Sequence, residues 1–143
     1  MKVSNRSLFC LLINGIGLLG LAIPAVAHHS FVAEFDESKP VKVTGTVTKV
    51  EWQNPHVWFY VDVKDETTGK VANWGFSGGA PGQLMRRGVT RDVIKPGMVI
   101  KVEGYRARDG SNNSSGGKVT FQDGRMVFTA SAEDRIPGEK DKK

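Results

Sequence analysis

Short runs in which apolar and polar residues alternate fill most of the sequence after residue 40, and they constrain the fold more than any other feature. In the stretch 56–64, every second residue from Val57 onward is apolar. A period of two residues is typical of a strand that buries one face. Turn sequences such as Asn54-Pro55 and Asp123-Gly124 separate the runs. The pattern therefore predicts an all-β domain of short strands.

A small OB-like barrel of five to six strands accounts best for the order of these runs. The first strand changes its apolar phase near Lys49 and contains Gly45, so we expect it to bend or bulge. A bent first strand shared by both halves of a barrel, with one short helix between strands three and four, is typical of the OB fold. A small β-sandwich with similar strand spacing is the alternative. The expected strands are 41–52, 56–64, 70–77, 98–106, 118–122 and 125–129, and the expected helix is 83–87.

Three segments of the expected domain, 28–130, and of the tail that follows it have no strand pattern. Residues 28–39 form a mixed polar lead-in to the first strand. Residues 109–117, with the sequence DGSNNSSGG, have the composition of a flexible loop. The charged tail 131–143 is expected to be disordered.

Residues 1–27 have the parts of a secretory signal peptide. Two basic residues precede a mostly apolar run, Leu8 to Ile23, and Ala25-Val26-Ala27 matches the small-x-small cleavage signal. The apolar run is short for a lasting membrane anchor and ends in a proline. We therefore expect a periplasmic or secreted protein that starts at His28 and has no membrane span after cleavage.

Charge and cysteine content narrow the classes of partner. The whole chain carries 20 basic and 15 acidic residues, and loss of Lys2 and Arg6 with the signal leaves 18 against 15, a charge of +3. Such a small charge argues against a nucleic acid partner. The single cysteine, Cys10, leaves with the signal. The mature chain is thus predicted to have no disulfide and no thiolate nucleophile or metal ligand.

Histidines at the expected mature terminus suggest a metal site. Cleavage after Ala27 would make His28 the first residue, so that its α-amine and imidazole could chelate one ion, and His29 is a further candidate ligand. His56 could supply a third nitrogen. Nitrogen ligands without thiolate suit Cu(II), with Ni(II) or Zn(II) as alternatives.

The metal hypothesis depends on reach. The twelve residues before Pro40 would have to span about 35 Å to bring His28 beside His56, which an extended chain can just do. The competing interpretation is a solvated terminus, with His56 doing no more than following the turn at Pro55.

Aromatic residues on the second predicted strand suggest a different binding site. His56, Trp58 and Tyr60 lie on the face opposite to the valines, and OB folds bind ligands on the face of strands two and three. Such a face, with arginines nearby, would suit a glycan, an anion or a partner protein. The alternative is that Trp52, Trp58 and Trp74 belong to the core or close the barrel. The candidate ligand-binding residues are Trp58, Tyr60, Trp74, Arg86 and Arg87, with Arg91 nearby.

No catalytic constellation is recognisable in the sequence. The Gly75-x-x-Gly78-Gly79 pattern lacks the strand, helix and lysine of a phosphate-binding loop. The serines and acids show no nucleophile-elbow or paired-acid context. We therefore expect a non-enzymatic binding protein, whose partner is a metal ion, a small ligand or an envelope protein.

Four stretches that cover nearly all of the mature chain carry a resemblance to known sequences. They include the His-His-Ser start and the Asn-Pro-His motif at 54–56. On these residues the chain resembles a family of small exported bacterial proteins of unknown function. The resemblance implies an OB-like barrel in the periplasm and brings no activity, substrate or catalytic residue. The stretches are HHSFVAEFD (28–36), VTGTVTKVEWQNPHVWFYVDV (43–63), WGFSGGAPGQLMRRG (74–88) and IKPGMVIKVEGYRARDG (94–110).

Overall fold

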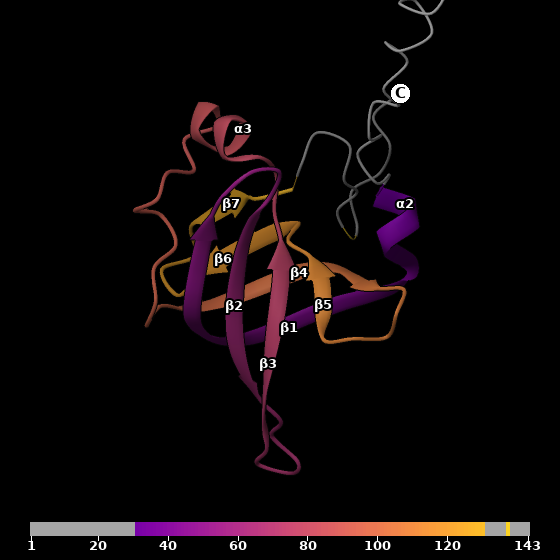
Figure 1. Cartoon of the computed structure of the whole chain (residues 1–143). Coiled ribbons are helices and arrows are strands. Elements are labelled where there is room, and N and C mark those ends of the chain that lie inside the picture. Colours follow the sequence, from indigo (N-terminus) through magenta and orange to yellow (C-terminus); the bar gives the residue numbers. More distant parts are fainter. Residues whose placement is uncertain (1–30, 131–136, 138–143) are drawn as a thin grey trace, which may run out of the picture.

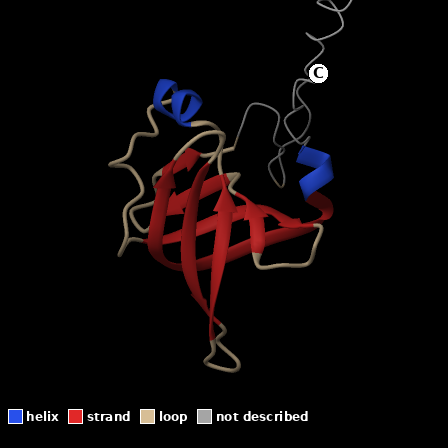
Figure 2. Ribbon diagram, in the orientation of Figure 1, coloured by secondary structure: helices blue, strands red, loops and turns tan. Residues whose placement is uncertain are grey.

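The computed structural model describes residues 31–130 and Pro137, and this part of the chain is all-β with two short helices. Figures 1 and 2 show strands that wrap around one another, with α3 beyond one end of them. The strands are β1 (Phe35–Trp52), β2 (Val57–Lys64), β3 (Val71–Ser77), β4 (Val99–Ala107), β5 (Asn113–Ser115), β6 (Lys118–Phe121) and β7 (Met126–Phe128). The helices are α2 (Phe31–Glu34) and α3 (Pro81–Arg86).

The seven strands form one sheet that curls back on itself. Their order is β1-β2-β3-β5-β4-β6-β7, and an additional pairing of β1 with β4 makes five strands a partial ring. The pairs are antiparallel apart from β3 with β5, which is parallel. This single curled sheet, with α3 between β3 and β4, is the expected OB-like barrel rather than a sandwich of two sheets.

The long first strand serves both halves of the barrel. Its first part pairs with β4 and its second part with β2. The register shifts between Val47 and Lys49, which confirms the predicted bulge. A Cβ on Gly45 would lie 2.1 Å from the backbone oxygen of Asp62, so only glycine allows β1 to pass this close to β2.

Alternate residues of the strands build the core. In β2, Val57, Phe59 and Val61 are buried, whereas Trp58 and Tyr60 remain partly exposed, as the alternation predicts. A second, smaller cluster lies under α3. The main cluster contains Val41, Val47, Phe59, Val61, Phe76, Ile94, Ile100, Val102, Val119 and Phe121, and the smaller one Val57, Leu84 and Val89.

The prediction of a flexible loop at 109–117 is wrong, because the centre of this segment forms β5. Ser114 and Ser115 are fully buried, and their hydroxyl groups bond the backbone of Tyr105: Ser115 Oγ accepts from its N–H and Ser114 Oγ donates to its carbonyl, both at 2.9 Å. Gly104 makes room for this strand, since a Cβ there would lie 1.8 Å from the oxygen of Ser115. The serines thus act as small strand residues packed on a glycine.

The polar lead-in 28–39 is also corrected. Helix α2 and the start of β1 occupy residues 31–39, and Phe31 and Phe35 are buried. The Phe31 ring lies 5.4 Å from that of Phe35 and 6.0 Å from that of Tyr105, measured between centroids. Phe31 and Phe35 therefore anchor residues 31–39, although the polar residues around them led us to predict a lead-in without a strand. His28, His29 and the tail 131–143, apart from Pro137, lie outside the described residues.

Candidate functional site

Trp58 and Tyr60 form a pair of aromatic rings on the outer face of β2. Their centroids lie 6.4 Å apart with 22° between the ring planes. His56, two residues before Trp58, follows the turn at Asn54–Pro55, whose peptide bond is cis. Because strand residues alternate between faces, the side chains of Trp58 and Tyr60 leave β2 on the side away from the core. We call Trp58 and Tyr60 the aromatic pair.

The backbone of β3 supports the aromatic pair from one side. Tyr60 is paired with Gly75 across the two strands. A Cβ on Gly75 would lie 3.4 Å from the Tyr60 ring and 3.5 Å from the Trp58 ring, so both rings lie over bare backbone. This contact explains why the pair is half-buried although it points away from the core, and it holds the rings in place.

A carboxylate and a lysine border the aromatic pair on β1. The Tyr60 hydroxyl donates to Glu51 Oε2 at 2.9 Å, and Lys49 Nζ lies 2.5 Å from Glu51 Oε1. The hydrogen bond with Lys49, and then that with Tyr60, lowers the pKa of Glu51 below its ordinary value. Burial, and then the hydrogen bond to Glu51, raises the pKa of Tyr60. Glu51 therefore stays ionised, and Tyr60 neutral, around neutral pH.

Polar groups continue beyond Tyr60 toward the β2–β3 turn. Asn73 Nδ2 donates to Asp62 Oδ1 at 2.7 Å and to Thr48 Oγ1 at 3.2 Å, which orients the amide. No link of Thr48, Asp62 and Asn73 with Glu51 was predicted from the sequence. The alternation of side chains along the strands could have predicted this grouping. Lys49 and Glu51 share a face of β1 beyond the bulge, and Asp62 lies on the same face of β2 as Tyr60.

The other predicted ligand-binding residues lie elsewhere. Trp74 leaves β3 on the core side, where its ring lies 6.4 Å from that of Phe76. Arg87 Nη1 donates to the Ala130 carbonyl at 2.9 Å, and the Arg91 guanidinium lies 5.6 Å from the Trp52 ring. Arg86 is exposed in the last turn of α3. These contacts do not bring Trp74 or the three arginines to the aromatic pair.

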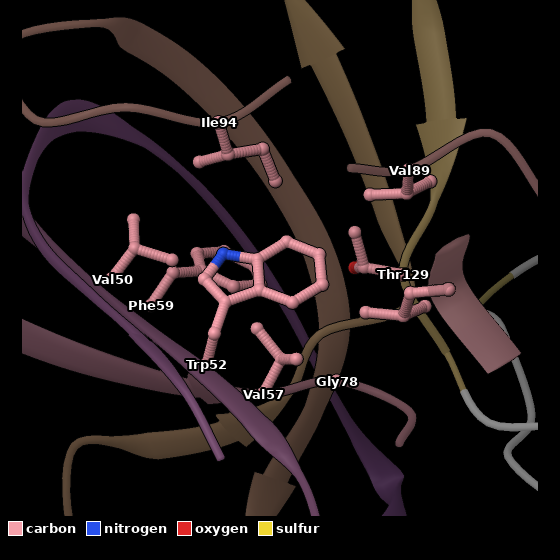
Figure 3. A pocket seen from close by; sticks show the side chains of 9 residues that line it. Val50, Trp52, Val57, Phe59, Gly78, Val89, Ile94 and Thr129 are labelled. Atoms are coloured by element: carbon pink, nitrogen blue, oxygen red, sulfur yellow. The ribbon is translucent and has the colours of Figure 1, made fainter. Parts of the chain in front are cut away.

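Trp52 closes the end of the barrel beneath α3. Figure 3 shows its indole among the residues of a small apolar cavity. The volume of about 10 Å³ has room for at most one water molecule. The Trp52 Nε1 atom is buried without a hydrogen-bond partner in the described part of the chain. The cavity is lined by Val50, Trp52, Val57, Phe59, Gly78, Leu84, Val89, Ile94 and Thr129, and it is too small for an organic ligand.

One ring nitrogen of His56 is held by the backbone. Nδ1 lies 2.9 Å from the carbonyl oxygen of Gly78. A carbonyl can only accept, so Nδ1 carries a proton, and in the neutral imidazole Nε2 is then the nitrogen with the lone pair. Within residues 31–130 and Pro137, no three or more His, Cys, Asp or Glu side chains are grouped as a metal site.

Together the fold and this surface define a small OB-like barrel that carries a supported aromatic pair on its outer side. The chain belongs to the family of unknown function DUF6152, whose profile matches residues 16–117. The expected resemblance to an uncharacterised family is thereby confirmed. No curated protein matches the sequence. Among the described helices, none is long and apolar enough to cross a membrane.

Proposed function

We propose that this protein is an exported, non-enzymatic binding module that takes a neutral glycan on the aromatic pair. The observation that carries the proposal is the arrangement of Trp58 and Tyr60, stacked on each other and supported by Gly75. Flat rings fixed on a rigid strand offer a surface for the C–H face of a sugar ring at little cost in conformational entropy. Export rests on the signal-like residues 1–27.

The polar border of the aromatic pair favours a neutral ligand over an anionic one. Glu51 and Asp62 offer carboxylate oxygens for sugar hydroxyls, and Asn73 offers an oriented amide. A few polar groups around an apolar surface are typical of small-molecule sites. The arginines that would suit an anion, Arg87 and Arg91, have their contacts with Ala130 and Trp52 instead.

A glycan titration tests this function. ¹⁵N-labelled mature protein is titrated with chitotriose, and the indole N–H signals are assigned from single Trp-to-Phe variants. We expect the Trp58 signal to move, Trp58→Ala to abolish binding, and Trp74→Phe to leave it unchanged. Thermal melts check that each variant is folded. Equal binding by folded Trp58→Ala would rule out the aromatic pair. Absence of any shift with chitotriose, maltotriose or cellotriose would rule out the glycan and leave a partner protein as the ligand of this face.

A metal ion held by His28 and His56 is the second candidate function, and the hydrogen bond of His56 to Gly78 favours it. Ligating histidines usually donate their second ring nitrogen to a carbonyl or carboxylate, which fixes the ligating one. His56 already has this arrangement, with Nδ1 bonded and Nε2 available. Together with the α-amine and imidazole of His28, Nε2 would make a nitrogen-only set that suits Cu(II).

Strand neighbours also shorten the distance that the terminus has to cover. Phe31 packs on Tyr105 of β4, and β4, β5, β3 and β2 are successive neighbours in the sheet. Three steps between adjacent strands measure about 14 Å, well below the 35 Å expected of a free lead-in. The anchoring of Phe31 therefore supports the second candidate, because the distance left to span from the described residues is shorter than that expected of a free lead-in.

A copper titration tests the second candidate. Intact mass first establishes whether His28 is the terminal residue, and Cu(II) binding is then followed by EPR near pH 7.5 and near pH 5.5. We expect nitrogen hyperfine structure that is lost in His28→Ala and simplified in His56→Ala. Affinity should be lower at the acidic pH, because protons compete for the nitrogen ligands. An authentic terminus that binds Cu(II) no tighter than His28→Ala would end this hypothesis, and glycan binding would be unaffected.

A further inference from the structure

A second surface feature, on the other side of β3 from the aromatic pair, is an open groove of about 450 Å³. Residues 39–43 of β1 form one wall, and Trp74 of β3 and Arg106 of β4 complete it. Trp74 and Gly75 are consecutive strand residues, so they point to opposite faces of the sheet. The groove is therefore separate from the surface proposed to bind a glycan. Its volume lies in the range of about 300–1,000 Å³ typical of small-molecule sites.

The groove exists because the ring of strands is incomplete beside β3. The parallel pairing of β3 with β5 involves only Gly75–Ser77 and Asn113–Ser115. The residues of β3 before Gly75, including Trp74, pair with β2 only. They lie beyond the first residue of β5, the strand beside β3 in Figure 1. A strand of three residues thus leaves an opening where a longer β5 would have closed the barrel.

The side chains that line the groove are positive and none of them is acidic. Lys39, Lys42 and Arg106 contribute three cations. Lys39 Nζ lies 3.3 Å from Asp36 Oδ2, but its side chain stays 59% exposed, so this ion pair leaves it accessible. Lys42 is paired with Glu103 across the strands and is one of the charges that lower the pKa of Glu103, after Lys118, so Glu103 partly offsets its charge. The groove therefore carries a net positive charge that favours an anion.

The guanidinium of Arg106 is held in place before any ligand arrives. Nε donates to the Ser111 carbonyl at 3.1 Å, and Nη2 donates to the Gly110 carbonyl at 2.7 Å. Its carbon lies 5.5 Å from the centre of the Trp74 ring, a cation–π contact. A guanidinium has five N–H donors, and these bonds use Nε and Nη2. Arg106 is thus a fixed cation beside an aromatic ring, with Nη1 to donate.

We infer that this groove binds a small organic anion that carries a ring, with its charged group at Arg106 and Lys39 and its ring against Trp74. An oriented guanidinium binds carboxylate, sulfonate or phosphate oxygens through directed, charge-assisted hydrogen bonds. The apolar side chains of Pro40, Val41 and Val43 cover the uncharged part of the ligand. Neither an inorganic ion nor an uncharged ring would use both halves of the groove.

The inference is tested with 2-naphthalenesulfonate, using the mature full-length protein. Shifts of the assigned Trp74 indole and Arg106 Nε signals are followed by NMR at low salt. The comparison ligands are 2-naphthalenemethanol, which has the ring without the charge, and sulfate, which has the charge without the ring. We expect saturable shifts with the sulfonate, binding at least about tenfold weaker with either comparison ligand, and weaker binding again at high salt.

Variants separate the groove from the general charge of the protein. Arg106→Gln should weaken binding about tenfold, the cost of roughly one charge-assisted hydrogen bond. Lys39→Gln should also weaken binding, and it keeps the test valid if loss of Arg106 loosens residues 110–112. Arg125→Gln removes an exposed arginine on the β6–β7 turn and should change nothing. Equal affinity in the Arg106, Lys39 and Arg125 variants, or shifts at Trp58 instead of Trp74, would overturn the inference. Trp58→Ala, which tests the glycan, should leave sulfonate binding intact.

Discussion

Glycines lie where the strands of this barrel come closest. They differ in which neighbouring atom fills the space that a Cβ would need. At Gly104 the obstacle is backbone, since a Cβ would lie 1.8 Å from the Ser115 oxygen. At Gly75 the obstacle is a side-chain atom, Asn113 Oδ1, at 2.5 Å. A side chain can rotate away, but a strand backbone held by its ladder cannot. The two positions should therefore respond differently to the same substitution.

We predict that Gly104→Ala lowers the free energy of unfolding by about 3 kcal/mol or more, because the strands must separate. Gly75→Ala should cost only about 1–2 kcal/mol. Asn113→Ala removes the obstacle at Gly75, so the double variant Gly75→Ala with Asn113→Ala should lose less than the sum of the single losses. Urea unfolding measures all four. Equal losses at Gly75 and Gly104 would contradict this account.

Glu51 should make stability depend on pH. Its pKa in the folded protein is lowered, first by the hydrogen bond with Lys49 and then by that with Tyr60. The unfolded chain takes up the proton near the ordinary value of 4.5, so the stabilisation is present above that pH and is lost as the pH falls through the lower folded value. Because the carboxylate is still partly exposed to solvent, the effect should be modest.

The variant Glu51→Gln should therefore lower the urea midpoint near pH 7 and have a smaller effect near pH 3, where part of the stabilisation has been lost. Glu66→Gln makes the same change in the exposed turn after β2 and serves as the control. A Glu51→Gln loss that persists unchanged at the acidic pH would show that the carboxylate charge is not the cause.

Among the secondary-structure elements, β5 differs most from the sequence-based prediction, which was a flexible loop. The amide of Gly116 donates to the Ser77 carbonyl at 2.7 Å and is buried. The amide of Gly69 donates to the Asp65 carbonyl at 2.8 Å but lies in the exposed β2–β3 turn. We predict slow hydrogen exchange at Gly116 and fast exchange at Gly69, measured by NMR. Fast exchange at both amides would contradict the strand and support a flexible loop at 109–117.

Periodic signals in the sequence were translated correctly into elements, whereas composition was misleading for the segments that form α2 and β5. Alternation identified β1, β2 and β4, the bulge after Val47 and the outward face of Trp58 and Tyr60. It did so because burial of one face imposes a period of two on any strand. Composition missed β5 and α2, because a serine packed on a distant glycine and a phenylalanine packed on Tyr105 have no local signature. For the same reason, the pairing of Trp74 with Arg106 could not be anticipated.

At the scale of the whole molecule, a small core should make unfolding cooperative and sensitive to single buried rings. Phe59 is 1% exposed and its ring lies 5.3 Å from that of Phe76. Phe59→Ala should cost about 3–5 kcal/mol, and Phe59→Asp, which buries an unpaired charge, should prevent folding. Trp58→Ala, next to it on the outer face, should cost clearly less. Thermal melts followed by circular dichroism give the comparison. Similar losses at the two positions would contradict the assignment of faces in β2.

The double pairing of β1 also sets the order in which the barrel can assemble. Its second half can meet β2 as a local hairpin, but its first half pairs with β4, which begins at Val99 and ends at Ala107. The ring thus depends on contacts between residues about sixty positions apart in sequence, and closing such long loops is slow. When the chain is synthesised or exported with its N-terminus first, it has no complete core until β4 is available. Its folding is therefore deferred to the last third of the chain, and the earlier strands stay accessible to whatever machinery handles the unfolded polypeptide.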